Sequence, residues 1–193
     1  PRVAAIAGEV DLAAAAGKVG FPCVLKVDSA DVIHKSDEGG VVLDIGDADS
    51  LADAFTDMKA RFTGGNPSFL VMEQKQAGTE LIIGATASPG LGSLVMFGLG
   101  GIFVEVLKDV VVAVSPLSRP EAREMMEGIQ GYPVLEGVRG KPGVDLTAVE
   151  DLLIRVSRLA ADFPSITEMD LNPIFAYPKG TPPAAVDVRI KVS

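Results

Sequence analysis

Hydrophobic positions along the chain follow a helical period in some stretches. Leu51, Phe55, Met58 and Phe62 recur at i, i+4, i+7 and i+11, which predicts a helix over 49–62 with Asp49 as its N-cap. A capping-box pattern, Thr147 to Glu150, opens a longer amphipathic stretch and predicts a second helix. The apolar face of that helix comprises Val149, Leu152, Leu153, Val156, Leu159, Ala160 and Phe163. Two further helices are expected, a short alanine-rich one over 11–19 and one from Ser118 to about Ile129.

Other stretches are short and apolar, or alternate between apolar and polar residues, as strands do. The expected strands are 21–28, 41–45, 69–72, 80–87, 94–97, 103–107, 110–114, 168–175 and 185–192, and 131–143 is expected to be a loop. Helices and strands are intermixed, with many antiparallel connections. This order favours an α/β protein of two α+β lobes over one doubly wound sheet. A polar run follows Met72, so we place the lobes at 1–73 and 74–193.

Composition narrows the class of protein. The 193 residues are 48% hydrophobic, enough for one core or for two small lobes. Cys23 is the only cysteine, which excludes a disulfide within the chain. No apolar run of membrane-spanning length and no signal sequence is found, so we expect a cytoplasmic protein without a membrane partner. A net charge of −9 argues against nucleic acid as a partner.

The first candidate site lies near the front of the chain. Lys26 interrupts an apolar strand, where an unpaired ammonium is costly to desolvate. Lys35 and the only histidine, His34, follow on a segment that ends in two glycines, Gly39 and Gly40. Two cations beside backbone N–H groups of a Gly-Gly turn indicate a phosphate site. The alternative is that Lys26 pairs with a carboxylate of the core.

A second candidate site lies near the end of the chain. The two-residue period of a strand puts Glu168, Asp170 and Asn172 on one face, and Asp187 lies on the polar face of the next strand. Mg²⁺ takes oxygen ligands, one or two from the protein and the others from phosphates and water. This acidic pair of strands therefore fits a magnesium nucleotide. It also fits an ordinary hairpin with a solvated polar face.

Four motifs in order resemble a known family. They read Val-Leu-Lys (24–26) with His-Lys-Ser-Asp-Glu-Gly-Gly-Val (34–41); Leu-Val-Met-Glu-Gln-Lys-Gln-Ala-Gly-Thr-Glu-Leu-Ile-Ile-Gly (70–84); Met-Phe-Gly-Leu-Gly-Gly-Ile-Phe-Val-Glu-Val-Leu-Lys-Asp (96–109); and Asp-Leu-Asn-Pro-Ile (170–174). Together they resemble the ATP-grasp (beta) subunit of NDP-forming, or ADP-forming, acyl-CoA synthetases, and more distantly the nucleotide-binding subunit of succinyl-CoA synthetase. The resemblance implies an ATP-grasp fold with nucleotide held between two lobes, ATP/ADP and Mg²⁺ as cofactors, and acid–thiol ligase activity.

The resemblance also implies roles for individual residues. Nucleotide contacts fall on Lys26, Lys35, Glu73, Gln74, Lys75, Glu80 and Glu105. The two lysines would meet phosphates, residues 73–75 the adenine, Glu80 the ribose, and Glu105 the metal or a cation of the phosphate loop. Asn172 and Asp187 are the implied metal ligands, with Asp170 a weaker candidate. Exposed strand or loop positions are the alternatives for Lys35 and Glu80.

His34 is implied to carry a phosphoryl group between the nucleotide and a partner's active site. A neutral imidazole nitrogen is a good nucleophile near pH 7, which suits this role. The alternative is a loop histidine hydrogen-bonded to Asp37 or Glu38.

The chain contains no Gly-x-Gly-x-x-Gly fingerprint after a strand, so CoA chemistry is expected on a CoA-binding ligase (alpha) subunit or fused domain, in a hetero-oligomer. Two features depart from the family pattern: Ala113 stands where many relatives place an arginine, and the front is short, as if the chain begins inside the domain. They favour the rival hypothesis of a regulatory ATP-grasp domain in a fused protein acyltransferase. A carboxylate–amine ligase is a third hypothesis, against which His34 and the 170–173 motif argue.

Overall fold

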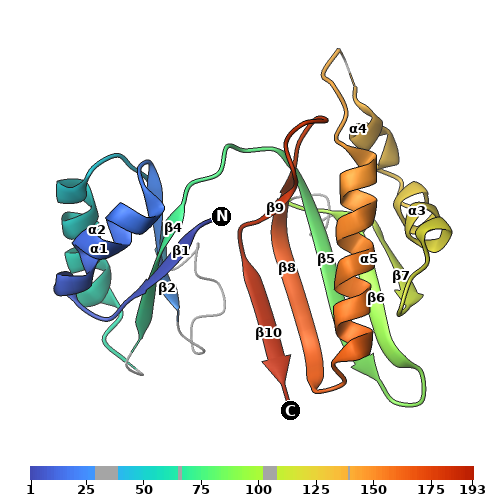
Figure 1. Cartoon of the computed structure of the whole chain (residues 1–193), viewed down its shortest axis with the longest axis horizontal. Coiled ribbons are helices and arrows are strands. Elements are labelled where there is room, and N and C mark those ends of the chain that lie inside the picture. Colours follow the sequence, from blue (N-terminus) through green and yellow to red (C-terminus); the bar gives the residue numbers. More distant parts are fainter. Residues whose placement is uncertain (29–38, 65–66, 102–107, 139) are drawn as a thin grey trace. The chain divides into compact units, whose positions relative to one another are not determined.

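The computed structural model describes residues 1–28, 39–64, 67–101, 108–138 and 140–193 (Figure 1). These residues form two compact units, Pro1–Gln76 and Ala77–Ser193. The division lies three residues beyond the boundary expected from the polar run, which was placed after Glu73.

The first unit is a four-stranded antiparallel sheet with two helices. The strand order is β1 (Val3–Ile6), β4 (Ser68–Glu73), β2 (Cys23–Asp28) and β3 (Val41–Ile45). A short 3₁₀ turn, η1 (Glu9–Asp11), leads into α1 (Leu12–Val19), and α2 is Ala48–Arg61. Leu25 and Val27 are fully buried and pack with Phe55 of α2 in one core. The helices therefore cover one face of this sheet.

The second unit is a six-stranded antiparallel sheet. Its order is β10 (Val188–Val192), β8 (Ile166–Ala176), β5 (Thr79–Ser88), β6 (Gly92–Leu99) and β7 (Val110–Val114), and β9 (Ala184–Ala185) pairs with β8. The helices are α3 (Arg119–Glu127), α4 (Tyr132–Glu136) and α5 (Leu146–Asp162), of which α5 lies along the sheet (Figure 1). Met169 and Leu171 of β8 are buried with Leu153 of α5 in the core of this unit. Asp170 and Asn172 therefore lie on the opposite face, as the alternation predicted.

Several elements differ from the sequence prediction. Strand β1 was not predicted, and α4 forms inside the expected loop 131–143. The single strand expected over 185–192 is divided into β9 and β10, with Asp187 between them. The expected strand 103–107 lies outside the described residues. Among helices of the described ranges, none is long and apolar enough to cross a membrane.

Two helix N-caps were assigned to the wrong residue. Asp47, not Asp49, caps α2 by accepting a hydrogen bond from Ser50 N at 2.8 Å. Asp145, not the Thr147 capping box, caps α5 through Ala148 N at 3.1 Å. More than one residue able to cap stands at each helix start, and extended backbone at the residue before the first turn selects the cap. The predicted capping box at Ser118 is confirmed, with Glu121 as its partner.

Glu150, expected in a capping box, instead ties α5 to α3. Its side chain is 1% exposed and accepts hydrogen bonds from Arg123 Nε at 2.9 Å and Nη2 at 2.7 Å. Arg119 binds the other carboxylate oxygen and also pairs with Asp151. Burial alone would raise the pKa of Glu150, but the hydrogen bonds from Arg123 and Arg119 outweigh it and hold that pKa below its ordinary value.

The end of the first unit is braced by its own side chains. Glu73 accepts hydrogen bonds from Lys75 Nζ at 2.9 Å and from Arg2 N at 3.0 Å, and its own N–H donates to Arg2 O at 2.9 Å. The hydrogen bond from Lys75 and the one from Arg2 lower the pKa of Glu73 to about 2. These contacts join the last residues of β4 to the start of β1.

We expect the arginine pairs of Glu150 to stabilise the second unit. Replacing both Arg119 and Arg123 by alanine would leave a buried carboxylate unpaired, which is strongly destabilising. Thermal unfolding should then begin several degrees lower than in the unchanged chain. Arg158→Ala is the matched control, because its pair with Asp162 is solvent-exposed and such pairs contribute about 0–1 kcal/mol. Equal midpoints for the two variants would contradict a stabilising role for the Glu150 network.

The Glu73 brace predicts a pH dependence. A folded-state pKa near 2, below the ordinary 4.5, means that the pairing stabilises the fold above about pH 4.5 and that this contribution is lost as the pH falls toward 2. Lys75→Met should therefore be less stable than the unchanged chain at pH 6, and the difference should shrink at low pH. Carbon NMR of the Glu73 carboxyl should show its pKa rising in Lys75→Met. A Glu73 pKa that is the same in both proteins would refute the brace.

Candidate functional site

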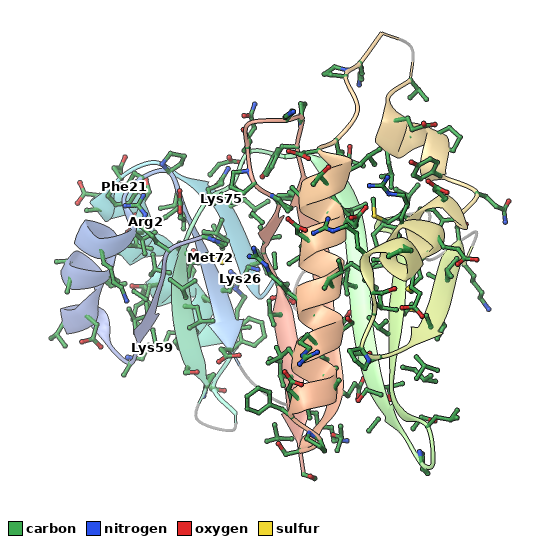
Figure 2. The ribbon with its side chains drawn as sticks, turned by 45° about the vertical axis from the view of Figure 1, so that its right-hand side comes forward. Arg2, Phe21, Lys26, Lys59, Met72 and Lys75 are labelled. Carbon is green, nitrogen blue, oxygen red and sulfur yellow. The ribbon has the colours of Figure 1, made fainter. Side chains whose placement is uncertain are left out.

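Lys26 lies on an inner strand of the first sheet. Strand β2 runs between β4 and β3, and Lys26 pairs with Leu70 on one side and Val41 on the other. Its neighbours Leu25 and Val27 are fully buried against the helices, so Lys26 belongs to the other face, where it is half-buried. Figure 2 labels Lys26 together with Met72, which comes from the adjacent strand β4. An ammonium group is thus held on a hydrophobic strand of this sheet.

His34 and Lys35 lie outside the described residues, but the two ends of their segment are described. At the first end, Ser68 Oγ donates to Asp28 O at 3.1 Å. At the second, Gly40 O accepts from Val27 N at 2.9 Å, and Gly39 O accepts from Arg61 Nη1 at 3.2 Å. Gly39 has a φ of 70°, which favours glycine. Strand β4 and helix α2 therefore hold the points where this segment leaves and rejoins the sheet.

The three predicted adenine-pocket residues begin at Glu73, the last residue of strand β4. The Glu73 and Lys75 side chains contact each other, as described above. Gln74 donates to Asp44 Oδ1 at 2.5 Å and accepts from Asp44 N at 2.7 Å, which holds Asp44 in a left-handed conformation with φ 58°. These side chains thus brace the segment internally.

Asn172 and Asp187, the predicted metal ligands, are neighbours in the second unit. Asn172 N donates to Asp187 O at 3.1 Å, which joins β8 to the gap between β9 and β10. Asn172 is exposed, and Arg189 Nε lies 3.8 Å from Asp187 Oδ2. Burial raises the pKa of nearby Asp170; Arg189 opposes the rise, whereas the Asp187 and Glu168 charges add to it. An amide and a carboxylate side by side supply two oxygen donors of the kind that Mg²⁺ prefers, so the residues fit the ion.

Glu80 lies near the start of β5 and is exposed. Its backbone carbonyl accepts from Gly100 N at 2.7 Å. A Cβ atom added at Gly100 would lie 3.0 Å from Glu80 Cβ, and one at Gly101 would lie 2.8 Å from Glu80 Oε2. The two glycines therefore let the end of β6 pack directly against Glu80. Glu105 lies outside the described residues and stays a prediction.

The predicted site residues thus form two groups, one in each unit. Lys26 and residues 73–75 belong to the first, and Glu80, Asn172 and Asp187 to the second. Within the described ranges, no group of three or more His, Cys, Asp or Glu side chains is arranged to hold a metal ion.

Sequence reasoning missed one buried acid of the second unit. Asp109 is 6% exposed and accepts hydrogen bonds from Gln130 N and Gly131 N, each at 2.7 Å. Its place at the end of the third motif was the only signal, because its partners are 21 and 22 residues away.

Comparison with known proteins identifies the family to which the chain belongs. A family model described as an ATP-grasp domain matches residues 2–192. The chain is 44% identical over 180 residues to an ADP-forming acetate–CoA ligase of Archaeoglobus fulgidus, covering 91% of this chain and 26% of the ligase. It is 40% identical over 179 residues to the beta subunit of an ADP-forming acetate–CoA ligase of Pyrococcus furiosus, covering 90% of this chain and 76% of that subunit. The chain thus spans about a quarter of the first relative and three quarters of the second.

The fold agrees with solved structures. Acetyl-coenzyme A synthetase 1 of Candidatus Korarchaeum cryptofilum, in complex with coenzyme A and Ca-AMPCP, superposes with a TM-score of 0.92 at 38% identity, covering 99% of this chain and 85% of that one. Another structure of that synthetase, with Mg-AMPPCP, is described with a phosphohistidine segment pointing towards the nucleotide binding site; its TM-score is 0.85 at 38% identity, with coverage of 100% and 85%. The two-unit α/β fold therefore agrees with the matched family, and the chain belongs to the ATP-grasp family, in the group that holds the beta subunits and domains of ADP-forming acetyl-CoA synthetases.

Proposed function

We propose that this chain is the nucleotide-binding part of an ADP-forming acyl-CoA synthetase. The overall reaction would be acyl-CoA + ADP + phosphate ⇌ carboxylic acid + CoA + ATP. Within it, the chain would bind Mg·ADP or Mg·ATP and exchange a phosphoryl group with His34. The observation that carries this proposal is Lys26, an ammonium group on hydrophobic strand β2 of an ATP-grasp domain.

Lys26 would neutralise phosphate charge. Its strand neighbours are apolar, so the local dielectric is low and a charge-assisted contact with a phosphate is stronger there than in water. Arginine and lysine both bind phosphate, but lysine does so as a point charge without a fixed geometry. That property suits a group that must hold the nucleotide before and after phosphoryl transfer.

The metal would be held through Asn172 and Asp187. Only one of these two side chains is charged, so the pair leaves an Mg²⁺ ion with positive charge for the nucleotide phosphates. Arg189 lies close to Asp187 and restrains its carboxylate. When bound, the ion would neutralise phosphate oxygens, and the two side chains would orient it.

The backbone that follows β4 would bind the adenine ring. The Glu73 and Gln74 amides donate to Arg2 O and Pro22 O, at 2.9 Å and 3.3 Å, so these two N–H groups are already used within the unit. An adenine edge needs one donor and one acceptor, which the following residues would supply from their main chain. The brace around Glu73 and Gln74 would fix that backbone. Glu80 would accept a hydrogen bond from the ribose.

His34 would carry the phosphoryl group. A related synthetase is described with a phosphohistidine segment oriented towards its nucleotide binding site, and the 34–41 motif of this chain is the matching candidate. In the transfer, an imidazole nitrogen would form a P–N bond as the bond from the γ-phosphorus to the ADP oxygen breaks. His34 is the only histidine, so any phosphohistidine on this chain must form there.

Acyl and CoA chemistry would reside on a CoA-binding alpha subunit or on a fused domain. Relatives of both kinds match: a separate beta subunit, and a longer ligase of which this chain spans 26%. The purified chain should therefore bind nucleotide but give no thioester-dependent ATP formation until that partner is added.

The nucleotide site can be tested by calorimetry with Mg·ADP. Lys26→Met and Asp187→Ala should each weaken binding roughly ten- to a hundredfold, because a charge-assisted contact contributes about 1.5–3 kcal/mol. Chelation of the metal should weaken binding to the unchanged chain in the same direction.

Lys59→Met is the matched control for Lys26→Met. Lys59 lies over the Phe55 ring on α2, at 5.6 Å, and has no proposed nucleotide contact. Its loss should leave the dissociation constant unchanged. If Lys26→Met and Asp187→Ala both bind as tightly as the unchanged chain, the site assignment is wrong.

The phosphoryl carrier can be tested with labelled ATP. Incubation should place an acid-labile, base-stable label on the unchanged chain. His34→Ala should keep its affinity for Mg·ADP while losing both the label and, with the partner present, the overall turnover. Turnover at the unchanged rate by His34→Ala with its partner would show that the histidine does not carry the phosphoryl group.

A further inference from the structure

Asp109 is a buried carboxylate that accepts hydrogen bonds from two backbone donors. Its Oδ1 and Oδ2 accept from Gln130 N and Gly131 N, each at 2.7 Å, and the side chain is only 6% exposed. A carboxylate that accepts N–H bonds from consecutive residues fixes the orientation of that turn. The turn in question joins α3 to α4.

The same turn packs closely against the end of strand β6. A Cβ atom added at Gly131 would overlap Leu99 Cδ1 and would lie 3.1 Å from Asp109 Oδ2. On the other side of the sheet, a Cβ atom at Gly98 would lie 2.6 Å from the Asp109 backbone oxygen. The carboxylate of Asp109 therefore lies close to Gly131, which packs against the Leu99 side chain, and its backbone oxygen lies close to Gly98, the residue before Leu99.

From Leu99 the contacts continue to Glu80. Leu99 pairs with Leu81, and the next residue, Gly100, donates to Glu80 O at 2.7 Å. Gly100 and Gly101 leave no room for a side chain between this turn and Glu80. A shift of Leu99 would therefore move the segment against which Glu80 rests.

We propose that Asp109 is a positioning residue of the nucleotide site: it holds residues 98–101 in place and, through them, Glu80. It acts on the nucleotide through Glu80 and does not touch it. This inference rests on the proposed function, because it assigns Asp109 to the ribose side of that site.

Asp109→Asn is the sharpest test. Asparagine keeps the shape, but its NH₂ group must face one of the two N–H donors, so one hydrogen bond is lost and two donors oppose each other. The variant should bind Mg·ADP about tenfold more weakly, since small displacements of positioning groups cost about this much or more. Amide hydrogen exchange of residues 98–101 and 130–131 should become faster.

Glu150→Gln is the matched control. It alters another buried carboxylate of the same unit, which lies on α5 and whose partners, Arg119 and Arg123, both lie on α3. It should lower the unfolding midpoint while leaving the Mg·ADP dissociation constant and the exchange of residues 98–101 unchanged. A merely structural role for Asp109 would give the same result for both variants.

A double-mutant cycle tests the route through Glu80. In a Glu80→Ala background, Asp109→Asn should have little further effect on the dissociation constant, because coupled residues are not additive. Additive effects would overturn the route. Should Asp109→Asn fail to fold, Gly131→Ala disturbs the same contact from the other side, with Gly17→Ala as its control, since a Cβ atom at Gly17 meets nothing within 4 Å.

The outcomes separate this inference from the proposed function. If the unchanged chain binds Mg·ADP and Asp109→Asn binds equally well, the positioning role is wrong and the proposed function stands. If the unchanged chain does not bind Mg·ADP, both are wrong.

Discussion

In both units, helices cover only one face of an antiparallel sheet, and the properties of the candidate site follow from that constraint. Side chains alternate along a strand, so each strand sends one set into the core and the other to the opposite face. In β2 the buried set includes Leu25 and Val27, and the other includes Lys26. In β8 the buried set includes Met169 and Leu171, and the other includes Asp170 and Asn172. Polar side chains therefore lie on hydrophobic strands without displacing apolar side chains from the cores.

This periodicity explains how much of the fold the sequence predicted. Helix α2 and strand β8 were predicted because burial on one side leaves a regular pattern of apolar residues at 3.6 or 2 positions. The same pattern placed Asn172 and Asp170 on one face. Strand β1 was missed because only four residues form it and two of them are alanines, which have a high helix propensity. Helix α4 was missed because its five residues lie between glycines.

The contacts that position the candidate site were less predictable, because their partners are distant in sequence. Glu73 and Arg2 are 71 residues apart, and Gln74 and Asp44 are 30 apart. Periodicity contains no information on such pairs. The family resemblance placed Glu73 and Gln74 at the nucleotide, and it gave no indication that their side chains also bind within their own unit. Glu150 shows the same effect: its local spacing fits a capping box, and its actual partners are arginines of another helix.

The position of Ala113 on the helix-covered face of the second sheet changes the interpretation of this residue. The family resemblance implies an arginine at about this position, so an alanine there suggested weakened phosphate binding. However, Ala113 pairs with Val95 and packs against the helix-covered core, together with Val111. Glu80 is exposed, and its neighbour Leu81 belongs to that core, so Glu80 and Ala113 start from opposite faces of the sheet. An arginine at position 113 would begin beneath α3, and its long side chain would have to pass the edge of the sheet to reach a nucleotide. The alanine therefore changes packing at the edge strand more directly than it changes the charge around Glu80, and it gives the regulatory hypothesis little support.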